Sequence, residues 1–191
     1  MPTVLLTGTT GFVGSALIKQ LLINKQKVIA AVRSEASLLP EGAQRFIAGE
    51  MSEDIEWNQE LHNIDVVIHV AARAHIMNDS VENSLSEFRK VNTEGTLNLA
   101  RQAADAGVKR FIFISSIKVN GEMTSTDQPF KPTDEHIPTD PYGLSKYEAE
   151  QGLLTVAKET GMDVVIIRPP LIYGPSVKAN FSSMMKWVNK C

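Results

Sequence analysis

The sequence predicts an α/β protein in which helices flank a doubly wound parallel sheet. Six short β-prone runs alternate with helical stretches along the chain. Three of them, Val66–Val70, Phe111–Ile114 and Val164–Ile167, are continuously apolar, as expected of strands buried on both faces of a sheet. A glycine-rich turn follows the first run and opens the first helix. Ligands of such sheets bind at the carboxyl ends of the strands, and every motif described below falls near such an end.

The elements are expected in a regular order along the chain. The strands are expected at Thr3–Thr7, Lys27–Val32, Arg45–Ala48, Val66–Val70, Arg110–Ser115 and Asp163–Arg168. Helices are expected at Phe12–Asn24, Ser84–Ala106 and Tyr142–Thr160, and glycines that suit a helix end, Gly107 and Gly161, follow the last two. Residues 118–141 contain four prolines and many polar groups, which predicts a long loop at a strand end.

The bulk composition is that of one globular domain. The chain has 191 residues, of which 43% are hydrophobic and 21% charged, which is enough apolar material for a sizeable core. The net charge of -3 gives no sign of a nucleic-acid partner, which would require a basic patch. No apolar run approaches the roughly 20 residues of a membrane span, and the N-terminus does not resemble a signal peptide. A single cysteine, Cys191, excludes a disulfide framework and a cysteine-based zinc site, so the cytoplasm is the expected compartment.

The turn after the first strand has the features of a phosphate-binding loop. Its sequence, Thr7-Gly8-Thr9-Thr10-Gly11-Phe12-Val13-Gly14, has the spacing G-x-x-G-x-x-G. Gly8 permits the tight turn, Gly11 lets the backbone approach a pyrophosphate, and Gly14 lets the helix pack closely on the sheet. Backbone N–H groups at the helix start then hold the negative charge. No Gly-Lys-Ser/Thr follows, which excludes a nucleoside-triphosphate P-loop, and the turn predicts a Rossmann-type dinucleotide site.

The residue that reads the adenosine ribose is expected about 20 positions further on, at the end of the second strand. An acid there accepts a hydrogen bond from a free 2′-hydroxyl and repels a 2′-phosphate. The residue is Arg33, followed by Ser34, which favours NADP over NAD. A solvated surface arginine is the alternative interpretation, and the nearby Glu35 weakens the distinction, so the cofactor is predicted as NAD or NADP.

Tyr142 and Lys146 are the candidate catalytic pair. In Tyr142-Gly143-Leu144-Ser145-Lys146 the two side chains are spaced i, i+4 and share one face of a helix. A nearby ammonium is expected to stabilise the phenolate and lower the pKa of the tyrosine from about 10, so that it can act as a base. Ser115-Ser116 ends the preceding strand and can supply a hydroxyl to the reacting oxygen. An isolated pair of this kind is more often a surface feature, but together with the glycine turn it predicts a catalytic site.

These motifs together resemble the extended short-chain dehydrogenases/reductases. The resemblance rests on the glycine turn, the serine pair, the tyrosine–lysine pair, His69-Val70-Ala71-Ala72, Asn92 and Arg168-Pro169-Pro170-Leu171-Ile172-Tyr173-Gly174-Pro175. Within them the chain is most similar to the NAD-dependent epimerase/dehydratase family, which includes UDP-glucose 4-epimerase. The motifs are in the family's order over nearly the whole chain, and they are specific for the family rather than for the substrate.

The resemblance implies a role for each matching residue. It implies that Ser116, Tyr142 and Lys146 are catalytic, that His69 is structural and that there is no metal site. The implied cofactor contacts are Gly8, Thr10, Gly11, Phe12, Val13, Gly14, Arg33, Glu50, Met51, Ala71, Ala72, Asn92, Ser115, Tyr142, Lys146 and Pro169. Glu50 stands where the family often has Asp, a mild departure. The implied substrate contacts are Ser116, Tyr142, Asn180 and Phe181.

The expected reaction is the epimerisation of a nucleotide sugar at a carbinol carbon. Dehydratases of the family resemble each other in an Asp-Glu pair after the catalytic Ser or Thr, but Ile117 and Lys118 stand here, which disfavours 4,6-dehydration. An NADPH-dependent 4-ketoreductase of a nucleotide sugar is the first alternative, because Arg33 suits a cofactor that is consumed. A non-catalytic dinucleotide-binding module is the second, although such members usually lose the tyrosine–lysine pair.

The resemblance also implies a division of the chain. Residues 1–175 are expected to form the dinucleotide-binding domain, and residues 176–191 to begin a C-terminal substrate lobe that is largely missing, with a helix at Phe181–Lys190. We therefore expect weak turnover or none from this chain. Family members often form homodimers through the two long helices, here about residues 84–106 and 142–160, although packing on the sheet explains their apolar residues equally well.

Overall fold

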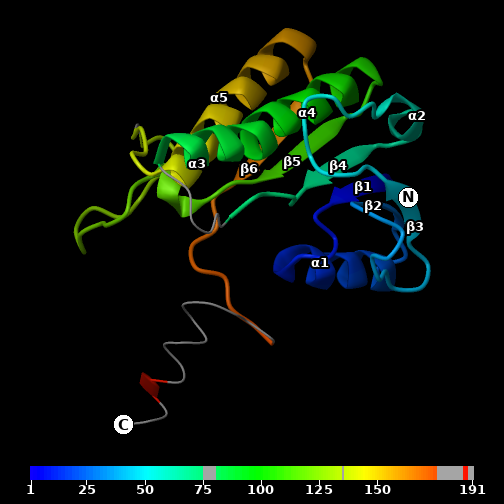
Figure 1. Ribbon diagram of the computed structural model, residues 1–191, viewed down its shortest axis with the longest axis horizontal. Coiled ribbons are helices and arrows are strands. Elements are labelled where there is room, and N and C mark those ends of the chain that lie inside the picture. The colour runs from blue at the N-terminus through cyan, green and yellow to red at the C-terminus, as the bar shows by residue number, and fades with distance from the viewer. Residues whose placement is uncertain (75–80, 135, 176–186, 189–191) are drawn as a thin grey trace.

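The computed structural model describes residues 1–74, 81–134, 136–175 and 187–188. Its strands are β1 (Thr3–Thr7), β2 (Lys27–Val32), β3 (Gln44–Ile47), β4 (Val66–His69), β5 (Arg110–Ile114) and β6 (Asp163–Ile167). They form one parallel sheet in the order β3-β2-β1-β4-β5-β6 (Figure 1). The connections change direction between β1 and β4. The carboxyl ends of these two strands therefore flank the crevice in which such sheets bind ligands.

The strands are apolar because both of their faces are covered. Side chains alternate along a strand, so in β1 Leu5 joins the core on one face of the sheet while Val4 and Leu6 join the core on the other. The core around Leu5 also contains Leu99, which comes from a helix on that face. The core around Val4 and Leu6 also contains Ile18, which comes from the first helix. All five of these side chains are buried. Burial on both faces explains why the runs are continuously hydrophobic rather than alternating.

The two faces of the sheet carry unequal helical layers (Figure 1). On one face lies α1 (Phe12–Ile23). On the other lie α3 (Val81–Phe88), the π-helical segment η1 (Arg89–Glu94), α4 (Gly95–Asp105) and α5 (Pro141–Thr160). The short α2 (Asn58–Leu61) packs against α4. In the described part of the chain, no helix combines the length and the apolar character that crossing a membrane requires.

The structure confirms the predicted fold class and corrects several boundaries. β3 begins one residue earlier than expected, and β4, β5 and β6 each end one residue earlier. The long helix expected at Ser84–Ala106 begins at Val81 and contains the π-helical turn η1, which hydrophobic periodicity alone does not indicate. The sequence did not indicate α2, because four residues are too few for a periodic pattern. Gly107 and Gly161 have left-handed backbones, with φ of 81° and 76°, as their places after helices predicted.

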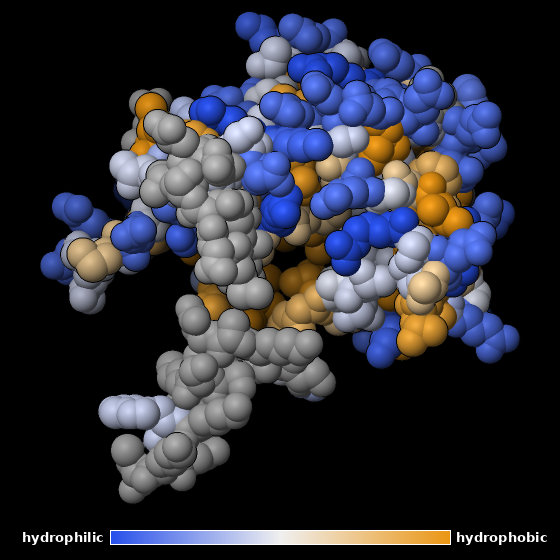
Figure 2. All heavy atoms as spheres, viewed as in Figure 1, coloured by the Kyte–Doolittle hydropathy of each residue, from blue (hydrophilic) through white to orange (hydrophobic). Residues whose placement is uncertain are grey.

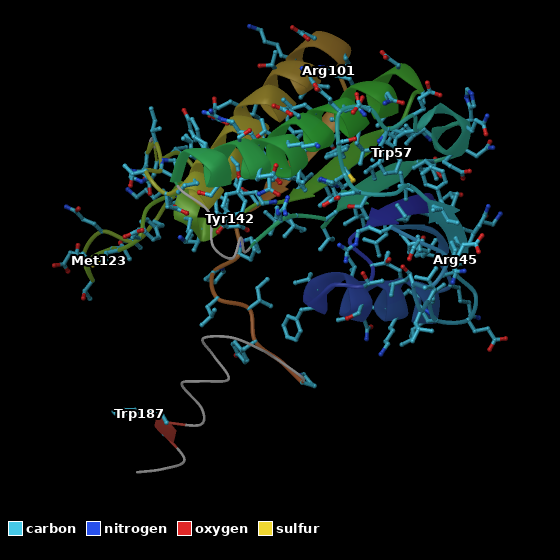
Figure 3. All side chains as sticks on the ribbon, in the orientation of Figure 1. Arg45, Trp57, Arg101, Met123, Tyr142 and Trp187 are labelled. Atoms are coloured by element: carbon cyan, nitrogen blue, oxygen red, sulfur yellow. The ribbon has the colours of Figure 1, made fainter. Side chains whose placement is uncertain are left out.

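The loop expected at residues 118–141 connects β5 to α5. It includes the 3-10 segment η2 (Ile117–Val119), and it extends away from the body near Met123, which is 88% exposed (Figure 3). Asp140 ends the loop as the N-cap of α5, because its Oδ1 accepts a hydrogen bond of 3.0 Å from the backbone N–H of Gly143. Pro141 occupies the first turn, where its missing N–H costs nothing. This cap fixes the point at which the helix carrying Tyr142 begins.

Candidate active site

A cavity of about 720 Å³ lies at the carboxyl ends of the strands. In Figure 2, hydrophobic residues form the bottom of a hollow between the layer of α3, α4 and α5 and the layer of α1. Most of the predicted site residues line the cavity. These are Gly8, Thr10, Gly11, Phe12, Val13, Arg33, Glu50, Met51, Ala71, Ala72, Ser115, Ser116, Tyr142, Lys146 and Pro169.

The turn after β1 is built for close approach of backbone to backbone. Gly8 has a φ of 69°, and a Cβ added to it would lie 2.6 Å from the backbone nitrogen of Ala71 and 2.8 Å from the carbonyl carbon of Val70. A side chain at this position would therefore be strained and would collide with the segment after β4. The N–H of Gly11 donates to the carbonyl oxygen of Gly8 over 3.0 Å and closes the turn.

Gly14, which the resemblance includes among the cofactor contacts, lies just beyond the cavity wall. It does not line the cavity, and it is buried in the first turn of α1. A Cβ added to it would lie 2.1 Å from the carbonyl oxygen of Gly8. Gly14 thus lets the helix N-terminus come close to the turn, as the sequence predicted for helix packing. Through this packing, the N-terminal end of α1 faces the cavity.

The hydroxyl group of Thr9 indicates what kind of ligand the cavity holds. It lines the cavity and is 3% exposed, and its Oγ1 has no hydrogen-bond partner among the described residues. A buried hydroxyl without a partner is unfavourable, and an oxygen-rich ligand at the turn would relieve that cost. Together with the space kept free by Gly8 and Gly14, Thr9 fits a bound nicotinamide dinucleotide whose pyrophosphate lies at this turn. Thr9 was not predicted as a site residue, because threonine is common in turns.

The cavity end formed by β2 and β3 contains the residues expected near adenosine. Arg33 directly follows β2, lines the cavity and is exposed. Glu35 is also exposed but does not line the cavity, so of these two charged residues Arg33 is the one at the cavity wall. Glu50 and Met51 line the same cavity after β3, as predicted from the family resemblance.

Tyr142 lies in the first turn of α5, near the carboxyl ends of the strands (Figure 3). Its ring packs edge-on against Phe88, with the ring centroids 5.8 Å apart. Burial raises the pKa of the phenol above its ordinary value, the hydrogen bond with Ser116 lowers it, and the carboxylate of Asp140 raises it. The net change is upward, which is opposite to the lowering expected from Lys146. The sequence could not show that burial dominates.

Lys146 is buried behind the tyrosine and lies at the cavity wall. Its residue is 1% exposed, its Nζ donates 2.9 Å to the carbonyl oxygen of Ile114, and the same Nζ lies 4.4 Å from the ring centroid of Phe113. Burial lowers the pKa of this amine to about 7, and the charge of Glu150 opposes part of that decrease. Burial of the phenol, rather than the charge of Lys146, therefore sets the direction in which the pKa of Tyr142 departs from its ordinary value.

Asn92 is not on the cavity wall, although the resemblance placed it among the cofactor contacts. It is fully buried in η1, and its amide both accepts from the N–H and donates to the carbonyl oxygen of Arg73, at 2.8 and 3.0 Å. It also donates a hydrogen bond of 3.1 Å to Oγ of Ser145, in the second turn of α5. Asn92 therefore joins the segment after β4 to the start of α5, and the π-helical turn places it between them.

His69 is the centre of a buried hydrogen-bond chain. Thr96 donates to the carbonyl oxygen of Asn92 over 2.7 Å, so its oxygen accepts from Nε2 of His69 at 2.9 Å. Nδ1 of His69 then accepts from Thr7, 2.8 Å away, and Thr7 Oγ1 accepts from the backbone N–H groups of Val70 and Ala71. Burial and the charge of Lys146 lower the pKa of His69 to about 3, so the ring is neutral. His69 thus supports the cavity floor, in agreement with the structural role predicted for it.

Two predicted substrate contacts and most of one expected helix lie outside the residues that the structure describes. Asn180 and Phe181 fall outside the described residues, as does most of the helix expected at Phe181–Lys190. Within residues 1–74, 81–134, 136–175 and 187–188, no three His, Cys, Asp or Glu side chains gather into a group that could hold a metal ion.

The sheet, the glycine turn and the Ser116–Tyr142–Lys146 group define the class of the protein, which is that of the extended short-chain dehydrogenases/reductases. Within this class, residues 4–190 match the model of the NAD dependent epimerase/dehydratase family. The chain belongs to this family, as its motifs predicted.

Curated relatives include several kinds of enzyme. The chain is 50% identical over 188 residues to UDP-glucose 4-epimerase of Vibrio cholerae, and the match covers 98% of this chain and 57% of that protein. It is 31% identical over 205 residues to dTDP-D-glucose 4,6-dehydratase of Homo sapiens, again covering 98% and 57% of the two chains. The chain thus spans just over half the length of these relatives.

Solved structures with the same fold are similarly longer. A UDP-glucose 4-epimerase with UDP-glucose from Thermotoga maritima has a TM-score of 0.76 and 26% identity, with 95% of this chain and 61% of that chain covered. A UDP-glucuronic acid 4-epimerase from Bacillus cereus, in complex with NAD, has a TM-score of 0.77 and 26% identity, with 98% and 63% covered.

Proposed function

We propose that the protein is an NAD(P)-dependent nucleotide-sugar epimerase of the UDP-hexose 4-epimerase type. The observation that carries the proposal is that Ser116, Tyr142 and Lys146 line the same cavity as the glycine turn. A sugar carbinol beside Tyr142 would then lie next to a dinucleotide held at Gly8 and Gly11. The UDP-glucose 4-epimerase relative at 50% identity supports the same substrate class.

The chain's own residues account for the proton transfer. When bound, the nicotinamide dinucleotide supplies the hydride acceptor and donor. In its phenolate form, Tyr142 takes the proton from the sugar hydroxyl and later returns it, so it is a phenolate again after a full cycle. Ser116, which lines the same cavity as Tyr142, orients the same sugar oxygen. Lys146 holds the nicotinamide ribose and, when protonated, stabilises the phenolate.

Dinucleotide binding is assigned to the other residues of the cavity wall. The backbone of Gly8, Thr10, Gly11, Phe12 and Val13 would contact the pyrophosphate, with Thr9 Oγ1 as an additional partner. Ala71 and Ala72 would line the path of the dinucleotide, and Glu50 and Met51 would lie near adenine. Pro169 and Ser115 would lie toward the nicotinamide end. Solved relatives that hold NAD support binding of this cofactor class.

A second candidate is an NADPH-dependent 4-ketoreductase of a nucleotide sugar. Arg33 favours it, because a guanidinium at the end of β2 suits a 2′-phosphate, and among the described residues Arg33 forms no ion pair that would occupy it. A reductase consumes its cofactor, for which NADPH is suited, whereas an epimerase regenerates it. Arg33→Asp is therefore expected to shift preference toward NADH if the reductase assignment is right.

The experiment is a single-turnover reaction with the protein in excess over UDP-galactose and NAD. Excess protein makes even weak turnover visible. The epimerase assignment predicts UDP-glucose without net reduction of NAD, and loss of this product in Tyr142→Phe. NADPH consumption with a UDP-4-keto sugar, and no epimerisation, would instead support the reductase. Dinucleotide binding with neither reaction would identify a non-catalytic binding module.

We further propose a homodimer through α4 and α5, as the family resemblance implies. Their outer surface includes Leu154, which is 51% exposed, and Arg101, which points away from the sheet (Figure 3). Sedimentation velocity of the chain and of Leu154→Glu tests this assignment. The dimer is expected for the former and the monomer for the latter.

A further inference from the structure

Glu150 is a buried carboxylate that the proposed proton transfer does not use. It is 0% exposed and lies on α5, one helical turn beyond Lys146, which in turn lies one helical turn beyond Tyr142. The three residues therefore share one face of the helix. Carboxylates are rarely buried unless paired, because the loss of hydration is costly. The interactions that offset the cost of burying the Glu150 carboxylate behind the catalytic pair must therefore be identified.

Two side chains from other elements hold the Glu150 carboxylate in place. Arg168, just after β6, donates to it from Nε, at 3.0 and 3.1 Å, and from a terminal nitrogen at 2.5 Å. Ser115, just after β5, donates its hydroxyl to Oε1 over 2.5 Å. A forked guanidinium contact of this kind fixes orientation as well as charge. The carboxylate is therefore held at one place relative to the ends of both strands.

The arginine that holds Glu150 also anchors the long loop before α5. One terminal nitrogen of Arg168 donates to Oδ1 of Asn120 over 3.1 Å and to the carbonyl oxygen of Pro132 over 3.4 Å. Nδ2 of Asn120 donates 2.7 Å to the carbonyl oxygen of Lys131. The position of Arg168, and hence its partial neutralisation of Glu150, is thus tied to the loop at the cavity edge.

The groups around Lys146 leave Glu150 as its principal charged neighbour. His69, from β4, is neutral because its pKa is about 3. Tyr142 is a neutral phenol, and the Asp140 carboxylate next to it is paired with Lys118 at 3.1 Å. The direct partners of the Lys146 amine are a carbonyl oxygen and an aromatic ring, and neither carries a net charge.

We infer that Glu150 is a positioning residue for the reaction, which sets the charge of Lys146 from behind the cavity while Arg168 limits its effect. The inference rests on the proposed function, in which the charge of Lys146 controls the phenol of Tyr142. Burial lowers the pKa of the amine, and the Glu150 carboxylate opposes part of that decrease. Since Arg168 neutralises that carboxylate in part, the two residues should act on Lys146 in opposite directions.

The test measures the pKa of Lys146 directly by NMR of protein labelled at the lysine Cε carbons, with the Lys146 signal assigned from Lys146→Arg. Glu150→Gln is expected to lower this pKa by about one unit, and Arg168→Gln to raise it by about as much. Glu148→Gln is the matched control, because Glu148 is also on α5 and also pairs with an arginine, Arg89 at 2.5 Å, but is 27% exposed. It should leave the Lys146 pKa unchanged.

The outcomes separate this inference from the proposed function, because the pKa is read without any sugar. Opposite shifts in the two variants with a silent control support the inference, even if no sugar is turned over. An unchanged pKa in folded Glu150→Gln overturns it, and so does an equal shift in Glu148→Gln. If Glu150→Gln does not fold, Arg168→Gln decides alone. A raised pKa there supports the inference, and an unchanged one overturns it.

Discussion

The two halves of the cavity are built by different means. The half beside β1, β2 and β3 is made by backbone, with Gly8 and Gly14 keeping space for close approach. The half beside β4, β5 and β6 has Lys146 at its wall and is supported by buried polar side chains, among them Glu150 and His69. The first half needs the absence of side chains, and the second needs side chains held at fixed places. Binding and chemistry are therefore expected to respond to different substitutions.

The largest expected effect is on turnover in the side-chain half. Tyr142→Phe removes the group that moves the proton and should lower kcat about 10²–10⁴-fold, the usual contribution of general acid–base catalysis. Tyr147→Phe is the matched control on the same helix and should leave kcat nearly unchanged. Kinetics with a UDP-hexose substrate measure both. Equal kcat in Tyr142→Phe and the unaltered chain would remove Tyr142 from the mechanism.

The next largest effect is on stability in the backbone half. Gly14→Ala places a Cβ where only 2.1 Å separates it from the Gly8 carbonyl oxygen. Relieving this clash should cost about 3 kcal/mol of unfolding free energy, and it should weaken dinucleotide binding as well. Chemical denaturation measures the loss. Lys19→Ala, at an exposed position of the same helix, should change stability by less than about 0.5 kcal/mol, and an equal cost in both variants would contradict the close approach.

A third effect depends on pH and comes from His69. Its pKa is about 3 in the folded chain and 6.5 ordinarily, so below pH 6.5 the unfolded chain binds a proton that the folded chain does not. Stability should therefore fall as the pH decreases from 6.5 toward 3, by on the order of 1 kcal/mol per pH unit. Denaturation curves of His69→Gln should lose this component, whereas the exposed His62→Gln should keep it. The same acid slope in all three proteins would show that His69 is not buried and neutral.

The smallest effect separates two roles of Asp140. Asp140→Asn keeps an acceptor for the N–H of Gly143 but removes the charge that raises the pKa of Tyr142. It should lower that pKa with little change in stability, since asparagine is also a good N-cap. Asp140→Ala should lower the same pKa and also cost about 1 kcal/mol. Ultraviolet titration measures the pKa of Tyr142, with Tyr142→Phe as the reference that identifies its signal. Chemical denaturation measures the change in stability. A tyrosine pKa that does not move in either variant would argue against the electrostatic role.

The backbone half was largely predictable from the sequence, and the side-chain half was predictable only in part. A glycine turn between an apolar strand and a helix is a local pattern, so Gly8, Gly11 and Gly14 could be identified without tertiary structure. The contact of Glu150 with Arg168 joins residues 18 apart, and that of His69 with Thr7 joins residues 62 apart. Such pairs depend on strand order and burial. The one local signal for Glu150 is its i+4 spacing from Lys146.

Packing also explains where the expectations and the structure differ. The pKa of Tyr142 was expected to be lowered by an ammonium, but burial of the phenol raises it instead. The resemblance implies a cofactor contact for Asn92, whose amide, on the π-helical turn, binds Arg73 and Ser145 in the structure. In both cases the residue type was identified correctly, and the environment that sets its role comes from packing.

Dinucleotide binding to two variants is the measurement that tests the account most directly. Fluorescence titration with NADH and NADPH compares Gly8→Ala, in the backbone half, with Tyr142→Phe, in the side-chain half. We predict that Gly8→Ala weakens binding at least about tenfold, because its Cβ would collide with the Ala71 backbone, while Tyr142→Phe stays within about threefold of the unaltered chain. Unchanged binding in Gly8→Ala, or lost binding in Tyr142→Phe, would contradict the division of the cavity into a binding half and a reacting half.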